Sequence, residues 1–103
     1  MSTNKIKNYG ISVIKTEISG AKKLFKSINL DFAKAISKLS KIKGKVVITG
    51  VGKSGHIASK ISSTMSSTGT LSQYCSPTDM SHGDLGIITK NDAIIIISNS
   101  GKS

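Results

Sequence analysis

A short apolar run that leads directly into a glycine-rich turn constrains the fold of this chain most strongly. Residues 45–49 read Lys-Val-Val-Ile-Thr, mostly β-branched and without polar alternation, as in a parallel strand that is buried on both faces. The turn Gly-Val-Gly-Lys-Ser-Gly follows at residues 50–55. A helix is expected over residues 54–68, and Gly69 is suited to end it in the left-handed conformation. Strand, turn and helix together predict the start of an α/β unit.

Two further segments have the composition of strands. Residues 70–75 form the second expected strand, and residues 93–97, Ala-Ile-Ile-Ile-Ile, form the third; residues 77–84 between them read as a loop or a short helix. Right-handed crossovers between parallel strands favour an open sheet of order 2-1-3. A helix after the third strand is needed to cover one face of such a sheet, so we expect a part of a longer α/β domain. A small complete domain is the alternative.

The N-terminal part of the chain predicts two helices. Over residues 14–28 the apolar residues are spaced by four and three, which predicts an amphipathic helix that is entered after Asn8. A second helix is expected to begin with Asp31 as its N-cap and to end at Gly44. The expected division is into a helical segment, residues 1–43, and an α/β domain, residues 44–103.

The charge of the chain is strongly basic and unevenly distributed. The sequence has 15 Lys and no Arg against 5 acidic residues, and its first 45 residues hold 11 of the Lys against two acids. A basic arm can bind nucleic acid through phosphate contacts. Without Arg, however, guanine cannot be read by a bidentate contact, and the four aromatic residues are not grouped into a stacking platform. We therefore expect solvated helix faces and no nucleic-acid partner.

Hydropathy and cysteine content bear on where the protein resides. The longest apolar run is the five residues 93–97, far below the roughly 20 residues that a membrane helix needs. Residues 1–12 lack the apolar stretch of a signal peptide. The single cysteine, Cys75, cannot form an internal disulfide, which fits a reducing compartment. We expect no membrane partner and a cytoplasmic location.

The glycine turn at residues 50–55 has the chemistry of an anion-binding loop. Glycines allow close approach of the backbone, amides at the start of the following helix attract negative charge, Lys53 adds a charge and Ser54 a hydroxyl. The same residues fit G-x-G-x-x-G, so NAD binding is an alternative, although residues 74–76, Tyr-Cys-Ser, stand where a dinucleotide site has an acid. A third interpretation is a glycine turn with a purely structural purpose.

A second hydroxyl-rich loop, Ser-Asn-Ser-Gly at residues 98–101, follows the third expected strand. Ligands of open α/β sheets bind outside the carboxyl ends of neighbouring strands, so this loop and the glycine turn are expected to converge on one small anion. An ordinary turn is the alternative, because Ser and Asn are frequent in turns. His82 lies on the connection before the third strand, where an imidazole can hydrogen-bond a sugar hydroxyl or move a proton.

Together these residues resemble the sugar isomerase (SIS) domain, and within it the arabinose 5-phosphate isomerases. The resemblance implies a flavodoxin-like sheet of five parallel strands between helices, of which this chain would hold three, often followed by two CBS regulatory domains. It also implies the interconversion of D-ribulose 5-phosphate and D-arabinose 5-phosphate for KDO and lipopolysaccharide synthesis, in a homotetramer. Five ordered motifs carry the resemblance: Gly44 to Val47, Gly50 to Ile57, Ser67 to Thr70, Ser81 to Gly86, and Ile97 to Gly101.

The resemblance also implies roles for individual residues. Lys53 would be the catalytic lysine, which stabilises the negative charge of an enediolate that forms between C1 and C2 of the sugar. The substrate-binding residues that it implies are Ser54, Gly69, Thr70, His82, Ser98, Asn99, Ser100 and Gly101.

Three departures from the family pattern limit what is expected of this chain. Ser76 precedes Pro77 where the family commonly has a histidine linked to zinc binding, so we expect no metal and no cofactor. Lys102 replaces an acid of the family. The later glutamates and histidine of the family have no counterpart up to Ser103, so we expect the 103-residue chain to be inactive alone. The alternative function is a regulatory module that binds a sugar phosphate without catalysis.

Overall fold

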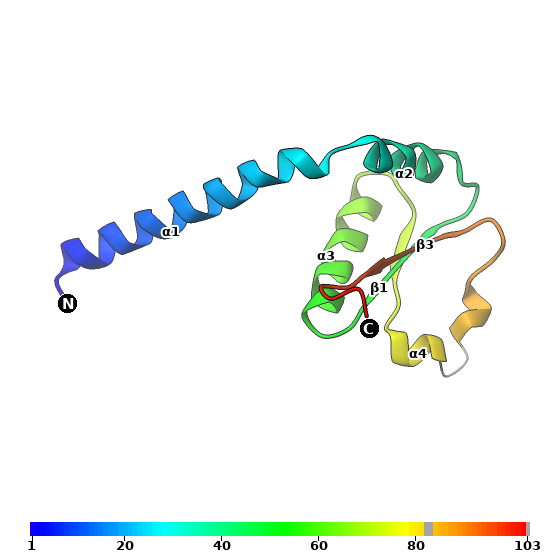
Figure 1. Cartoon of the computed structure of the whole chain (residues 1–103). Coiled ribbons are helices and arrows are strands. Elements are labelled where there is room, and N and C mark those ends of the chain that lie inside the picture. Colours follow the sequence, from blue (N-terminus) through cyan, green and yellow to red (C-terminus); the bar gives the residue numbers. More distant parts are fainter. Residues whose placement is uncertain (82–83, 103) are drawn as a thin grey trace. The chain divides into compact units, whose positions relative to one another are not determined.

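The computed structural model describes residues 1–81 and 84–102, and the backbone alone at residues 84 and 85. Two compact units make up the chain, residues 1–37 and residues 38–103. Figure 1 shows the elements in chain order.

The first unit is helical. Helix α1, Thr3–Lys23, begins earlier than expected because the Ser2 hydroxyl accepts a hydrogen bond from the Lys5 N–H at 3.2 Å and caps the helix. The expected entry after Asn8 is therefore wrong. A 3-10 turn, η1 at Leu24–Ser27, follows α1. None of the side chains of α1 and η1 is buried.

Helix α2, Leu30–Lys41, joins the two units. Its cap is Asn29, whose Oδ1 accepts a hydrogen bond from the Phe32 N–H at 3.1 Å. The expected N-cap, Asp31, lies instead in the first turn, where a negative charge faces the positive end of the helix dipole. The N-cap prediction is thus wrong by two residues, because Asn and Asp have similar capping strength and the sequence offers both.

The second unit contains a three-stranded parallel sheet of order β2-β1-β3, as the sequence predicts. The central strand β1, Val46–Gly50, pairs with β2, Ser72–Tyr74, and with β3, Ala93–Ile97. Helix α3, Lys53–Ser67, connects β1 to β2 and packs along the sheet. The α/β fold with flanking helices is therefore confirmed, although β2 is shorter than the six residues expected.

The connection from β2 to β3 holds two short helical elements. Helix α4, Pro77–Ser81, follows β2 directly, and a 3-10 turn, η2 at Asp84–Ile87, precedes β3. The sequence left this stretch open between a loop and a short helix. Five residues are too few for a periodic pattern to decide that choice.

The core of the second unit lies between α3 and one face of the sheet. Val46 and Ile48 on β1 and Ala58 on α3 are fully buried. They are joined by half-buried side chains of α2, its C-terminal flank, α3 and the other strands: Leu39, Ile42, Met65, Tyr74, Ile95 and Ile97. On the opposite face, Val47 is buried, whereas Ile94 and Ile96 of β3 stay 45% and 69% exposed. This sheet is well covered on the α3 face and open along β3 on the other.

Lys45 and Asp92 form a nearly buried ion pair at the start of β1 and β3. The Lys45 Nζ lies 3.0 Å from Asp92 Oδ2 and donates to the Ile87 carbonyl at 2.6 Å. Asp92 accepts further hydrogen bonds from the N–H groups of Lys45 and Thr89, each at 2.8 Å. Hydrogen bonds from these two backbone N–H groups, and then from the Lys45 side chain, hold the pKa of Asp92 well below its ordinary value of 3.8. One carboxylate thus fastens the beginnings of two neighbouring strands.

Candidate functional site

Each glycine of the turn after β1 meets a specific steric demand. A Cβ on Gly50 would lie 2.8 Å from the Ser54 backbone and 3.0 Å from the Ile97 carbonyl oxygen. A Cβ on Gly55 would lie 2.7 Å from the Gly50 carbonyl oxygen. Gly52 has a φ of 59°, in the left-handed region that favours glycine. These glycines let α3 begin in direct contact with the ends of β1 and β3.

The first turn of α3 presents the polar part of this segment. Its hydrogen bonds run from the N–H groups of Ser54 and Gly55 to the carbonyls of Val51 and Gly52, at 3.1 and 3.0 Å. Lys53 is the first residue of the helix and is exposed, while Ser54 is half-buried. A cation, a hydroxyl and a helix N-terminus lie together here, which suits an anion.

The second predicted loop follows β3 and is organised by its own hydroxyls. The Gly101 N–H donates to Ser98 Oγ at 2.9 Å, and the Lys102 N–H donates to Ser100 Oγ at 3.1 Å. Gly101 has a φ of 75°. The Ser100 hydroxyl accepts here through its oxygen, and a hydroxyl in this role can also donate its proton to an acceptor such as a phosphate oxygen.

The structure brings the two loops together, as the sheet order predicts. Gly50 and Ile97 are paired in the β1-β3 ladder and end their strands side by side. The glycine turn with Lys53 and Ser54 therefore leaves the sheet next to the loop at residues 98–101. This is the carboxyl edge of the sheet, where open α/β folds bind their ligands.

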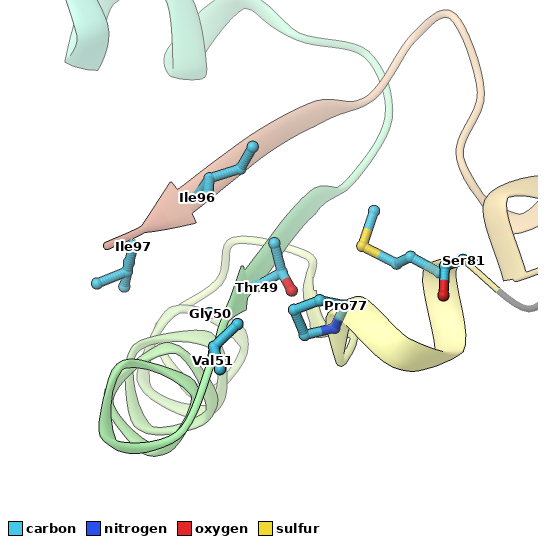
Figure 2. A pocket seen from close by; sticks show the side chains of 8 residues that line it. Thr49, Gly50, Val51, Pro77, Ser81, Ile96 and Ile97 are labelled. Atoms are coloured by element: carbon cyan, nitrogen blue, oxygen red, sulfur yellow. The ribbon is translucent and has the colours of Figure 1, made fainter. Parts of the chain in front are cut away.

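A cavity of about 340 Å³ opens at the same edge. Figure 2 shows its walls, which come from the end of β1, from α4 and from β3. The volume is near the lower limit of roughly 300–1,000 Å³ for small-molecule sites, which suits a small ligand better than a dinucleotide. The lining residues are Thr49, Gly50, Val51, Pro77, Met80, Ser81, Ile96 and Ile97.

The sequence did not identify most of the residues that line the cavity. Pro77 and Met80 carry no chemistry that marks a site, and they reach the cavity only because α4 folds against the end of β1. Thr49 did leave a signal, because it is a hydroxyl at the end of an otherwise apolar strand. It is 5% exposed, and its Oγ1 has no hydrogen-bond partner within the part of the chain that the structure describes.

Two predicted substrate-binding residues, Gly69 and Thr70, lie at the amino ends of the strands, opposite the carboxyl edge. They follow the C-terminus of α3, whose 15 residues span about 22 Å at 1.5 Å per residue. The Thr70 N–H donates to Met65 at 2.8 Å, and the next carbonyl, of Leu71, accepts from the first residue of β1. Gly69 has a φ of 104°, so its expected role in ending α3 agrees with its backbone. Within one chain, these two residues are not brought together with Lys53.

Two further sequence expectations concern the connection after β2. His82 lies outside the described residues, so its role stays a prediction. The Ser76 hydroxyl, at the family's zinc-linked position, accepts a hydrogen bond from the Asp79 N–H at 3.1 Å and caps α4. A hydroxyl used in this way does not fit a zinc site, whose ligands are imidazole, thiolate or carboxylate. Within residues 1–81 and 84–102, no three His, Cys, Asp or Glu side chains gather closely enough to hold a metal ion.

Among the residues described, none of the helices combines the length and the apolarity that crossing a bilayer requires.

Known proteins are similar to this chain in sequence and in fold. The Rickettsia prowazekii protein RP505 is 43% identical over 103 residues, which are 100% of this chain and 32% of RP505. Arabinose 5-phosphate isomerase KdsD of Yersinia pestis is 47% identical over 94 residues, which are 91% of this chain and 29% of the enzyme. The chain thus spans about a third of the length of these relatives.

A solved structure shares the arrangement of the elements. The structure of E. coli CFT073 c3406 in complex with arabinose 5-phosphate superposes with a TM-score of 0.91 at 39% identity, and the match covers 100% of this chain and 55% of the other. The SIS domain family matches residues 38–103, which include the sheet, the glycine turn and the second loop. On its sequence and on its fold, this chain belongs to the SIS domain family.

Proposed function

We propose that this chain is the sugar-phosphate-binding part of an isomerase that interconverts D-arabinose 5-phosphate and D-ribulose 5-phosphate. The observation that carries the proposal is the meeting of two polar loops at the carboxyl ends of β1 and β3, beside a cavity of about 340 Å³. Relatives named arabinose 5-phosphate isomerase and a related structure that holds arabinose 5-phosphate support this substrate. In such an enzyme D-arabinose 5-phosphate would serve KDO and lipopolysaccharide synthesis. The enzyme itself would be a homotetramer. A reducing cytoplasm fits a chain whose single cysteine, Cys75, cannot form an internal disulfide.

In this proposal the phosphate group lies between the two loops. The Ser100 hydroxyl donates to a phosphate oxygen, with Ser98, Asn99 and Gly101 on the same loop, and Ser54 donates from the first turn of α3. The dipole of α3 favours the anion at this place. Lys53 supplies the positive charge, either to the phosphate or to the oxygen anion that develops during the reaction.

The proposed reaction moves one proton from C2 to C1 and one from O2 to O1. A base takes the proton from C2 of the aldose, and the electrons of the C–H bond form the C1–C2 double bond of an enediolate whose negative charge lies on O1. The hydroxyl proton of O2 then passes to O1, a proton is delivered to C1, and C2 becomes the ketose carbonyl. Lys53 stabilises the enediolate charge. None of the side chains that line the cavity in the described part of the chain is ionisable, so the base is not at this wall. We expect the 103-residue chain to bind the sugar phosphate without converting it.

The same observation favours a second candidate function, a regulatory module that binds a sugar phosphate and has no catalytic step. The two functions predict the same ligand for this chain. They differ after binding, because only the isomerase requires a base that faces C2 of the bound sugar. A turnover assay with D-arabinose 5-phosphate on any protein that contains this chain separates them.

Calorimetric titration of the chain with D-arabinose 5-phosphate tests the proposal. K53M should weaken binding by roughly five-fold to ten-fold, as expected when a charged hydrogen-bond donor is removed. K60M is the matched control, because Lys60 is an exposed lysine two turns further along α3. NAD should show no saturable binding. Tighter binding of NAD than of the sugar phosphate, or equal effects of K53M and K60M, would contradict the proposal.

A further inference from the structure

The hydroxyl of Thr49 is a feature of the cavity that phosphate binding by the two loops does not explain. The residue is 5% exposed, and Oγ1 has no partner among the described residues. Burying a hydroxyl without a hydrogen bond destabilises the folded state, so native structures keep few of them. Figure 2 shows the Thr49 oxygen on the side of Pro77, among the side chains that line the cavity.

The fold itself does not require a hydroxyl at this position. The three preceding residues of β1, Val46, Val47 and Ile48, are apolar and fully buried. Valine has the shape of threonine with a methyl group in place of the hydroxyl, and it has a high preference for strands. A valine at position 49 would continue the strand and remove the unpaired group. The hydroxyl at position 49 therefore points to a ligand.

The surroundings of Thr49 define what that ligand must offer. The walls next to it are apolar: Val51, Pro77, Met80 and Ile96. The other hydroxyl of the lining, on Ser81, already donates to the Thr78 carbonyl at 2.9 Å. A threonine hydroxyl both donates and accepts, so it matches another hydroxyl. Thr49 also directly precedes the glycine turn, so a ligand whose phosphate lies at the turn can reach the cavity with its carbon chain.

We propose that Thr49 is a specificity-determining residue, whose Oγ1 exchanges a hydrogen bond with a hydroxyl on the carbon chain of the bound sugar phosphate. The proposal rests on the proposed function, because it needs a sugar phosphate at this edge of the sheet. It assigns recognition of the phosphate to the two loops and recognition of the sugar hydroxyl to the cavity. A site that is built to pair a hydroxyl discriminates strongly against ligands that lack one.

Four forms of the 103-residue chain test this assignment: the wild type, T49V, T49S and T78V. T49V removes the hydroxyl and keeps the shape, whereas T49S keeps the hydroxyl. T78V is the matched control, because Thr78 is exposed on α4 and does not line the cavity. Each form is titrated with D-arabinose 5-phosphate and, separately, with inorganic phosphate. Thermal unfolding without ligand shows that each variant is folded; if T49V folds poorly, T49A replaces it in the comparison with T49S.

The proposal predicts that T49V weakens D-arabinose 5-phosphate binding by roughly ten-fold and leaves phosphate binding unchanged. T49S should stay within about three-fold of the wild type, and T78V should equal it. If the wild type binds the sugar phosphate and T49V binds it equally well, Thr49 has no such role, while the proposed function stands. If T49V weakens the binding of both ligands equally, the substitution disturbs the carboxyl edge of the sheet as a whole. The role assigned to the Thr49 hydroxyl is then wrong. If the wild type binds no sugar phosphate, both proposals fail.

Discussion

Gly55 shows how a single residue positions the candidate site. Its missing side chain leaves room for the Gly50 carbonyl oxygen, which would lie 2.7 Å from a Cβ, and for the Tyr74 hydroxyl, at 3.0 Å. Both neighbours belong to the sheet, so α3 can contact the end of β1 only through a glycine at this position. The structural interpretation of the glycine turn and the anion-binding one are therefore compatible: the close packing places the helix N-terminus next to the second loop.

Gly55→Ala should destabilise the second unit by about 1–2 kcal/mol. The clash with a backbone oxygen costs more than the roughly 1 kcal/mol that alanine gains over glycine in a helix. Urea unfolding followed by Tyr74 fluorescence in a Tyr9→Phe background measures the change, because Tyr9 and Tyr74 are the two tyrosines of the sequence. Gly20→Ala in α1 is the control, because nothing lies within 4 Å of its Cβ position. An unchanged unfolding midpoint for Gly55→Ala would show that α3 is not held this closely.

For single residues, the sequence predicted which side chains suit an anion better than it predicted where each of them lies in the fold. Lys53, Ser54 and the loop at residues 98–101 lie at one edge, as expected. Gly69 and Thr70 lie at the other edge, and topology alone was sufficient to see this, because a loop that follows the helix of a βα unit returns to the amino ends of the strands. Thr49 was missed although a hydroxyl after an apolar run is visible in the sequence, because only the structure shows that this hydroxyl is buried with no partner among the described residues.

Helix α2 shows what decides an element boundary. Asn29 and Asp31 are both good caps, and the backbone selects Asn29. Asn29→Ala should lower the stability of this helix by about 1 kcal/mol, because the Phe32 N–H loses its acceptor. Asn29→Asp keeps an acceptor and is the matched control. Far-UV circular dichroism during thermal unfolding measures the difference; equal effects of the two substitutions would rule out the side-chain cap.

The ion pair between Lys45 and Asp92, at the starts of β1 and β3, makes the stability of the second unit sensitive to acid. The pKa of Asp92 is lowered in the folded state, mainly by hydrogen bonds from the backbone N–H groups of Thr89 and Lys45. A carboxylate with a lowered pKa contributes stability above its unfolded pKa, near 3.8, and that contribution is lost as the pH falls through the folded pKa.

Asp92→Asn should therefore be clearly less stable than the wild type at pH 7, and the difference should shrink as the pH is lowered below about 4. Urea unfolding at a series of pH values measures it. Asp31→Asn, which removes an exposed carboxylate from α2, controls for the loss of one negative charge. A difference that stays constant from pH 7 to pH 3 would contradict the role given to the Asp92 carboxylate.

Among the elements, the strands were the most predictable and the short helices the least. The apolar runs at residues 45–49 and 93–97 have the length and the β-branched composition of buried parallel strands, whereas β2, Ser72–Tyr74, is polar and half the length expected. The order of the three strands follows from right-handed crossovers. Helix α4 has five residues, too few for a periodic pattern, yet it supplies Pro77 and Met80 to the cavity. The cavity was thus beyond sequence reasoning, although the edge at which it lies was not.

The whole molecule has the fold of its family and matches only part of the length of its relatives. Its second unit carries the sheet, both loops and the cavity, and the family match covers the same residues, 38–103. The chain spans about a third of the length of curated relatives, so the full activity of such an enzyme is a proposal for this chain. We propose above all that the carboxyl edge of the sheet binds a sugar phosphate.

Amide chemical-shift mapping of the isotopically labelled 103-residue chain with D-arabinose 5-phosphate tests that claim most directly. We predict saturable shifts at residues 50–55 and 98–101, and at Thr49, with no comparable shifts at Gly69 and Thr70. The spectrum reports each loop separately, so it also decides whether the two loops bind one ligand with one affinity. Shifts confined to Gly69 and Thr70, or no saturable shifts at millimolar sugar phosphate, would contradict the account.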